Sequence, residues 1–287
     1  MHWTKRRERF RAILAGERCV HPASVYDPIS ARIAEDLGFE SGMLAGSVAS
    51  LAVIGAPDLV TLSLSEFAEL AYRINRAGNL PLMVDADHGY GNALGVKRCV
   101  EELETAGVAA LTIEDTELPA PFGASEKPRL IPLAEGVGKM KAALAGRQDP
   151  SLAIFGRTSA AAVTSLEDCI ARIRAYEAAG VDALFVLGIQ TREALAQVSA
   201  AVKLPLMLGQ AAPAIADPGF LVSQRVRLTL QGHQPFAAGV RAVHETLKAL
   251  REGTPPAEIK TAASAQLMAQ VTREADFKRW TKEFLGG

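Results

Sequence analysis

The stretch Leu80-Pro-Leu-Met-Val-Asp85-Ala-Asp87-His-Gly-Tyr-Gly91 decides the fold of this chain. A short apolar run, residues 80–84, leads directly into two carboxylates and a glycine-rich turn. Apolar runs this short, bounded by turn-forming and polar residues, are typical of strands that are buried on both faces of a parallel sheet. We therefore expect a buried strand that ends in polar side chains capable of chemistry.

Seven further apolar runs alternate with amphipathic stretches along the chain. The eight predicted strands are residues 19–21, 42–46, 80–84, 109–113, 152–155, 183–187, 205–208 and 226–230. Helical patterning lies between them, for example at 65–77, 94–106, 166–179 and 191–202. This alternation predicts an α/β fold, a (β/α)8 TIM-type barrel, whose usual size is roughly 250 residues. A doubly wound open sheet is the alternative, because alternation alone does not prove closure.

The pattern also predicts how the two ends of the chain are organised. Near the start we expect a helix whose Phe10, Ile13 and Leu14 face inward. The sequence Gly253-Thr-Pro-Pro-Ala ends the last predicted barrel helix. We therefore expect residues 1–253 to form the catalytic barrel and residues 254–287 to form a C-terminal helical tail.

Composition excludes several classes of protein. The 287 residues are 49% hydrophobic and 22% charged, and 31 Lys and Arg balance 32 Asp and Glu to a net charge of −1. Such a chain is neither disordered nor a nucleic-acid binder that relies on basic charge. No stretch approaches the roughly 20 apolar residues of a membrane helix. Three scattered cysteines, Cys19, Cys99 and Cys169, indicate a reducing compartment, and we expect a cytoplasmic protein without membrane partners.

Asp85 and Asp87 are the sharpest chemical feature of the sequence. Side chains two residues apart on a strand point to the same face, so both carboxylates enter the barrel mouth together. Two carboxylates in one apolar mouth repel each other, and a hard divalent cation such as Mg²⁺ or Mn²⁺ relieves that repulsion. The alternative is a helix N-cap with a solvent-exposed partner.

Three more acids follow predicted strands. Glu114 and Asp115 end the fourth strand, and only one of them can face the barrel mouth because adjacent strand residues point to opposite faces. Periodicity does not choose between the two, and both could instead cap the next segment. Asp58 follows Pro57 in the loop after the second strand, where a turn-forming role is the simplest interpretation.

Arg157 and His233 also lie at strand ends. A guanidinium that emerges from an apolar strand needs an anionic or polar partner, so Arg157 binds a substrate carboxylate or pairs with a barrel acid. His233 follows Gly232 at the end of the eighth strand. No HxH or HExxH spacing predicts a zinc site, and no glycine-rich nucleotide loop occurs.

Taken together, these motifs resemble the isocitrate lyase/phosphoenolpyruvate mutase superfamily. The resemblance runs in order through residues 10–250, and the Asp85–Asn92 element is its most specific part. Within the superfamily, the chain is most similar to the oxaloacetate decarboxylase branch. The motifs that carry the resemblance are Gly46-Ser47, Ala56-Pro57-Asp58, Asp85-Ala-Asp-His-Gly-Tyr-Gly-Asn92, Ile113-Glu114-Asp115, Gly156-Arg157-Thr158 and Gly232-His233.

The resemblance implies a role for each matching residue. Asp85 would be the direct Mg²⁺ ligand, and Asp58, Asp87 and Glu114 would hold the ion through waters. The remaining residues would contact a small 2-oxo dicarboxylate: Gly46 and Ser47 its carboxylate, with Arg157 and His233 as catalytic and substrate-binding groups. The resemblance also implies a homotetramer in which the C-terminal helices exchange between neighbouring barrels.

Departures from other branches narrow the expected reaction. The loop at residues 116–125 lacks the cysteine that carbon–carbon lyases of the superfamily use, and Leu187-Gly188 stands where 2-methylisocitrate-type lyases carry a glutamate. The resemblance therefore implies Mg²⁺-dependent decarboxylation of oxaloacetate to pyruvate and CO2 through a metal-stabilised enolate. The alternatives are another 2-oxo acid lyase or phosphonopyruvate hydrolase-like reaction, or a barrel that binds 2-oxo acids without catalysis.

Overall fold

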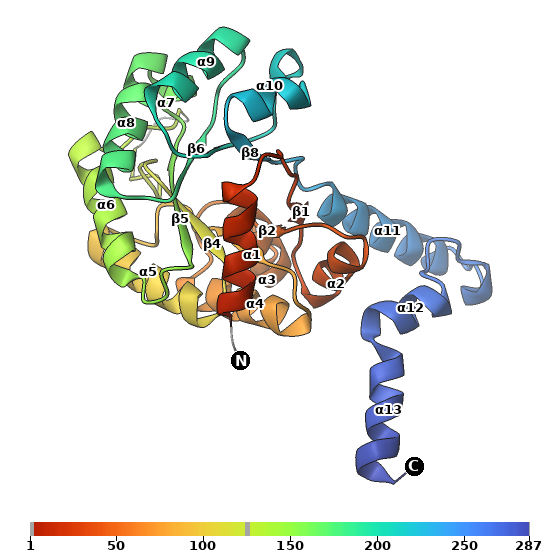
Figure 1. Ribbon diagram of the computed structural model, residues 1–287. Coiled ribbons are helices and arrows are strands. Elements are labelled where there is room, and N and C mark those ends of the chain that lie inside the picture. Colours follow the sequence, from red (N-terminus) through yellow and green to blue (C-terminus); the bar gives the residue numbers. More distant parts are fainter. Residues whose placement is uncertain (1–2, 124–126, 287) are drawn as a thin grey trace.

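The computed structural model describes residues 3–123 and 127–286 and contains one eight-stranded parallel sheet. The strands pair in sequence order, from β1 to β8, as in an α/β TIM-type fold (Figure 1). This order confirms the predicted fold class. The strands are β1 (Ala23–Ser24), β2 (Gly42–Leu44), β3 (Leu82–Asp85), β4 (Ala110–Glu114), β5 (Ala153–Thr158), β6 (Ala183–Val186), β7 (Leu206–Leu208) and β8 (Val226–Thr229).

The helices lie mostly around the outside of the sheet, except the first, which covers one end of it, and the last three, which lead away from it (Figure 1). They are α1 (Thr4–Ala15), α2 (Pro28–Asp36), α3 (Gly46–Ile54), α4 (Leu64–Ala77), α5 (Ala93–Thr105), α6 (Leu133–Gly146), α7 (Ala160–Val163), α8 (Leu166–Ala179), α9 (Arg192–Ala201), α10 (Pro218–Ser223), α11 (Gln234–Arg251), α12 (Ala265–Thr272) and α13 (Glu274–Leu285), with short 3₁₀ turns η1 (Pro213–Ile215) and η2 (Pro256–Glu258). Of the loop at residues 116–125, Ala124 and Ser125 lie outside the described residues.

The first strand differs from its prediction. The expected run at 19–21 contributes a single bridge, from Val20 to Leu228 of β8, whereas β1 begins only at Ala23. Pro22 separates the two because it has no N–H to donate to a ladder. The Val20 N–H donates to Arg227 (2.9 Å), so the chain before β1 pairs with β8 while β1 itself pairs with β2.

The alternation of side chains along each strand produces two apolar layers. Leu82 and Val84 of β3 pack outward against the helices, whereas Met83 packs inside the barrel. In β4 the small Ala110 faces inward and Leu111 faces outward. Residues that continue the inward face beyond Met83 and Ala110 therefore arrive at the barrel mouth.

Helix α1 closes the end of the barrel where the strands begin. Phe10 is fully buried and meets Phe155 edge-on at 6.1 Å, which confirms its predicted inward face. Burying such a side chain contributes roughly 1.5–3 kcal/mol. The polar side of the helix is less exposed than its sequence indicates, because Arg6 and Arg7 are also buried and donate hydrogen bonds to backbone carbonyls, among them that of Val108.

The C-terminal helices lead away from the barrel (Figure 1). None of the residues of α11 is buried within the described chain, and its apolar Val240, Val243 and Leu247 are 54–62% exposed. The segment returns to α2, where Val271 of α12 is buried and Arg273 forms an ion pair with Asp36 at 2.7 Å. The predicted division at residue 253 stays a prediction, and the chain departs from the barrel already at α11. No helix of the described residues is long and apolar enough to cross a membrane.

Candidate active site

A cavity of about 330 Å³ opens at the carboxyl ends of the strands. Its apolar walls include Met43, Phe185, Leu187 and Leu230. The structure brings nearly all of the predicted site residues to this one cavity, and Gly46 adjoins it beside Asp87. The predicted residues that line it are Ser47, Asp58, Asp85, Asp87, Glu114, Arg157 and His233.

Asp85 lies at the centre of the polar cluster, as the last residue of β3. Its Oδ1 accepts a hydrogen bond from the Thr112 hydroxyl (2.8 Å) and one from the Asp87 N–H (3.3 Å). Its Oδ2 forms an ion pair with Arg157. Thr112 was missed by the sequence analysis, although it shares the inward face of β4 with Ala110 and could have been found from that register.

Asp87 is held in a tight turn after β3. Its φ of 48° is unusual for a residue with a side chain, and its carbonyl accepts the N–H of Glu114 (2.8 Å). Burial, followed by the nearby charges of Asp85 and Glu114, raises the pKa of Asp87 to about 8. The carboxylate packs so closely on Gly46 that a Cβ there would lie 2.5 Å from Oδ2. Only glycine at position 46 leaves room for this carboxylate.

The structure separates Glu114 from Asp115. Glu114 continues the inward face of β4 into the cavity, where its Oε2 lies 3.0 Å from Arg157. Burial raises the pKa of Glu114 to about 7, against the opposing effect of Arg157. Asp115 points to the helix side, fully buried, and accepts hydrogen bonds from Arg172 (3.0 Å) and the Tyr176 hydroxyl (2.7 Å).

Arg157 of β5 pairs with barrel acids, the second of its two predicted roles. Its guanidinium contacts both Asp85 and Glu114, and it lies 5.2 Å from the centre of the Phe185 ring. Burial alone would lower the pKa of Arg157, but Asp85 and Glu114 outweigh it and raise the pKa above its usual value. The side chain is therefore a fixed cation among the carboxylates.

Asp58 lies at the rim of the cavity on an exposed loop. Partial burial, and then the charge of Asp85, raise the pKa of its carboxyl. Two residues later Val60, which also lines the cavity, has a φ of 56°. A β-branched residue in this left-handed region is strained, so the loop is held in shape rather than being a relaxed turn.

Ser47 and His233 line the cavity from the ends of β2 and β8, the strands on either side of β1. Ser47 lies in the first turn of α3, whose N-cap, Ala45, provides no side-chain hydrogen bond, so backbone N–H groups of this turn remain available to an anion. His233 shares a 2.8 Å hydrogen bond between its Nδ1 and the Ser24 hydroxyl. Burial lowers the pKa of His233 and outweighs the nearby charge of Asp85, which would raise it. The lowered pKa favours a neutral ring. Ser24 was not predicted, and its place in a two-residue strand gave no signal.

The cluster fits a hard divalent cation. Asp58, Asp85, Asp87 and Glu114 supply only carboxylate oxygens, the donors that Mg²⁺ and Mn²⁺ prefer. Burial raises the pKa values of Asp87 and Glu114 even beside Arg157, and a divalent cation would oppose that rise by favouring the ionised carboxylates. In the described chain no three acidic, His or Cys side chains are already arranged around a metal position, since Arg157 lies between two of the acids.

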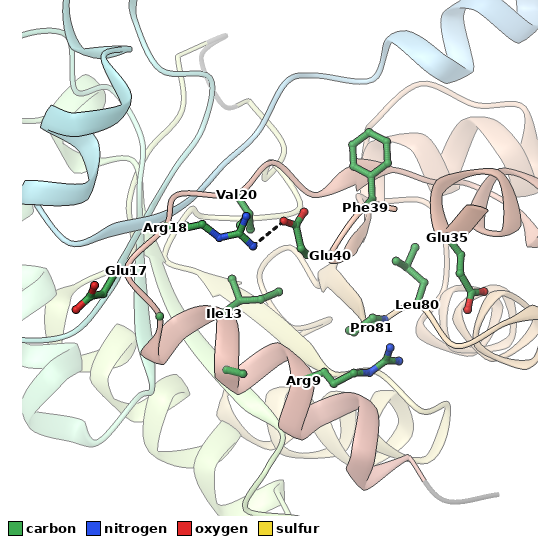
Figure 2. A pocket seen from close by; sticks show the side chains of 12 residues that line it. Arg9, Ile13, Glu17, Arg18, Val20, Glu35, Phe39, Glu40, Leu80 and Pro81 are labelled. Atoms are coloured by element: carbon green, nitrogen blue, oxygen red, sulfur yellow. Dashed lines mark hydrogen bonds and ion pairs between the residues drawn. The ribbon is translucent and has the colours of Figure 1, made fainter. Parts of the chain in front are cut away.

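A second cavity, of about 430 Å³, lies at the opposite end of the barrel beside α1 (Figure 2). Its charged side chains include Arg9, Glu35 and an ion pair between Arg18 and Glu40 at 3.0 Å. Arg9 and Glu35 bond the backbone of Asn79. These four charges are paired with one another or with the main chain, and Glu17, which also lines the cavity, is exposed to solvent. This cavity therefore lacks the buried acids of the strand-end site.

Comparison with known proteins agrees with this geometry. "Oxaloacetate decarboxylase" of Bradyrhizobium diazoefficiens is 60% identical over 286 residues, covering 100% of this chain and 99% of that protein. Phosphoenolpyruvate phosphomutase from Streptomyces platensis is 26% identical with a TM-score of 0.87, covering 97% and 99% of the two chains. Phosphonopyruvate hydrolase in complex with oxalate and Mg²⁺ is 26% identical with a TM-score of 0.83, covering 98% and 99%. The family model for phosphoenolpyruvate phosphomutase matches residues 10–251, and the chain therefore belongs to this family.

Proposed function

We propose that this protein decarboxylates oxaloacetate to pyruvate and CO2 with Mg²⁺ at the strand-end cavity. The observation that carries the proposal is the cluster of four carboxylates around Arg157 in a cavity with apolar walls. The full-length similarity to proteins named oxaloacetate decarboxylase, at 53–60% identity, supports the same reaction. The cavity volume of about 330 Å³ suits a small dicarboxylate.

The substrate would be held at the first turn of α3. The backbone N–H groups near Gly46 and Ser47, together with the Ser47 hydroxyl, offer donors to a carboxylate, and the positive end of the helix dipole adds to the attraction. Ser24 occupies Nδ1 of His233, so Nε2 is the ring nitrogen that can contact the substrate. These groups orient the 2-oxo acid with its carbonyl toward the carboxylate cluster.

The residues that would hold Mg²⁺ are Asp85, with Asp58, Asp87 and Glu114 around it. When bound, the ion supplies Lewis-acid polarisation of the 2-oxo carbonyl. Arg157 already bridges Asp85 and Glu114, so it fixes the orientation of both carboxylates. Manganese has the same preference for oxygen ligands and would serve as a substitute.

The chemical step breaks the bond between C3 and C4 of oxaloacetate. CO2 leaves, the bonding electron pair forms a C2–C3 double bond, and negative charge develops on the C2 oxygen. The fixed guanidinium of Arg157 stabilises that charge at close range because the apolar walls exclude water. C3 then takes up one proton to give pyruvate. No nucleophile is required, in agreement with the absence of a cysteine from the 116–125 loop.

The test is turnover of oxaloacetate before and after chelator treatment, with the metal's own catalysis subtracted. We expect activity to disappear with chelator, to return with Mg²⁺, and to be absent from Asp85→Ala. Phosphonopyruvate and 2-methylisocitrate serve as competing substrates. Faster turnover of either one, or full activity of Asp85→Ala, would exclude the proposed reaction.

We further propose that the C-terminal helices pack on a neighbouring copy in a homotetramer, with residues 254–287 as the exchanged tail. The exposed apolar side of α11 and a cavity of about 470 Å³ lined by Tyr26, Phe236, Val240 and Val243 support this assembly. Val243→Asp would place a charge on that surface. We expect sedimentation velocity to show smaller particles for this variant than for the wild type, and an unchanged distribution would contradict the proposal.

A further inference from the structure

The turn that carries Asp87 has an unusual backbone. Asp87 and Tyr90 have φ values of 48° and 57°, and Gly89 and Gly91 between and after them have 80° and 149°. Left-handed conformations at residues with side chains are unfavourable and persist only where the surroundings fix them. The position of the Asp87 carboxylate therefore depends on what holds this turn.

Three hydrogen bonds fix the carbonyls of the turn. The Gly89 N–H donates to Ala86 (2.9 Å), within the turn itself. The Glu114 N–H of β4 donates to Asp87 (2.8 Å). The third comes from a side chain, because the Lys139 ammonium donates to the His88 carbonyl at 2.9 Å. Lys139 thus ties the turn to α6, an element that contributes no residue to the strand-end cavity.

Lys139 is an unusual lysine in its environment. It is 3% exposed, whereas lysine side chains are seldom buried unless paired with an acid. It takes part in none of the ion pairs recorded within residues 3–123 and 127–286. The burial of this ammonium is explained by its bond to the turn and by the wider field of Glu114, Asp115 and Glu135.

We propose that Lys139 is a positioning residue that holds the turn at residues 87–91, and with it the Asp87 carboxylate, in the geometry that binds the metal. The proposal rests on the proposed function for its metal. The sign of the effect separates it from simple electrostatics. Removing a nearby positive charge would strengthen cation binding. Loss of the hydrogen bond would instead free the turn and weaken cation binding.

Two variants test the proposal, with a matched control. Lys139→Met removes the hydrogen-bond donor. Lys139→Gln keeps a polar group, but its side chain is one bond shorter and does not reach the His88 carbonyl. The Gln variant therefore still tests the proposal if Lys139→Met fails to fold. Lys141→Met is the control, since Lys141 is an exposed residue of the same helix with the same charge and length.

The first measurement is Mn²⁺ binding to purified protein, followed by the paramagnetic resonance of free Mn²⁺. We expect both Lys139 variants to bind Mn²⁺ about 10- to 100-fold more weakly than the wild type, as is common when a partner behind a metal ligand is removed. Lys141→Met should bind like the wild type. Equal or tighter binding by folded Lys139→Gln would overturn the proposal.

The second measurement, hydrogen exchange without metal, does not depend on the proposed function. We expect the Gly89 amide to exchange at least about 10-fold faster in the Lys139 variants than in Lys141→Met, since its bond to Ala86 depends on a fixed turn. Unchanged exchange would overturn the role of Lys139. Failure of the wild type to bind Mn²⁺, with faster exchange in the variants, would instead refute the proposed metal site alone.

Discussion

Replacing Gly46 by Ala should damage the site without damaging the fold. A Cβ at this position would lie 2.5, 2.8 and 2.9 Å from Oδ2, Oδ1 and Cγ of Asp87, whereas an ordinary contact begins at 3.4 Å. The carboxylate must therefore retreat by about 1 Å, a displacement that can cost about 100-fold in rate. Because Gly46 begins α3, the added methyl group should leave helix stability unchanged or raise it by up to about 1 kcal/mol.

The assay compares kcat/KM for oxaloacetate with thermal stability in the same preparation. Gly138→Ala is the matched control, because Gly138 lies inside α6 and a Cβ there meets nothing within 4 Å. The control should gain about 0.5–1 kcal/mol of stability and keep full activity. For Gly46→Ala we expect about 100-fold lower kcat/KM with an unchanged or higher Tm. Full activity in Gly46→Ala would refute the reasoning, since it would mean that the position of the Asp87 carboxylate does not matter.

Two further substitutions test ion pairs that stabilise the barrel, one between Asp115 and Arg172 and one between Asp149 and Arg7. Asp115→Asn should destabilise the fold by about 3 kcal/mol, measured by urea unfolding, because it removes the buried charged partner that Arg172 has just after β4. Asp149→Asn should cost about 1 kcal/mol near neutral pH. Burial alone would raise the pKa of Asp149, but hydrogen bonds from Ser151 and Arg7 hold it well below the ordinary 3.8. The folded state therefore binds this proton less readily than the unfolded state, so the stabilisation is complete above the ordinary pKa and is lost as the pH falls below it. Urea unfolding at about pH 7 and about pH 3.5 should show the difference from wild type shrinking at the lower pH, and a constant difference would contradict the assignment.

The sequence was sufficient for the sheet because each strand is a short apolar run between polar or turn residues, a pattern that burial on both faces imposes. The sequence was insufficient at β1, where the apolar run ended at Pro22. The pattern did not reveal that the residues before Pro22 pair with β8 and those after it with β2. The direction of α11 was also beyond reach, since an amphipathic helix looks the same whether its apolar side covers its own barrel or another.

The site shows a similar division. The two-residue spacing of Asp85 and Asp87 predicted both carboxylates at the mouth, but strand geometry accounts only for Asp85, because Asp87 lies in a left-handed turn beyond the end of β3. Periodicity alone did not choose between Glu114 and Asp115. The family resemblance favoured Glu114, and the physical reason is the register of β4, which depends on tertiary packing of Ala110 against the interior. The pairing of Arg157 and the contact of Gly46 with Asp87 join residues 41 or more positions apart, and no local pattern encodes such distances.

The contacts that hold α1 against the barrel determine when this helix can dock during synthesis of the chain. Arg11 of this helix bonds the Asp182 carboxylate at 2.9 Å across a sequence separation of 171 residues. At about 5–20 residues per second, a ribosome needs roughly 10 to 30 s to add that partner after the helix itself. Until then Phe10 has no complete barrel to enter, so the first helix described in the chain docks among the last. A nascent chain arrested before residue 182 should leave α1 open to protease, whereas the finished barrel should shield it.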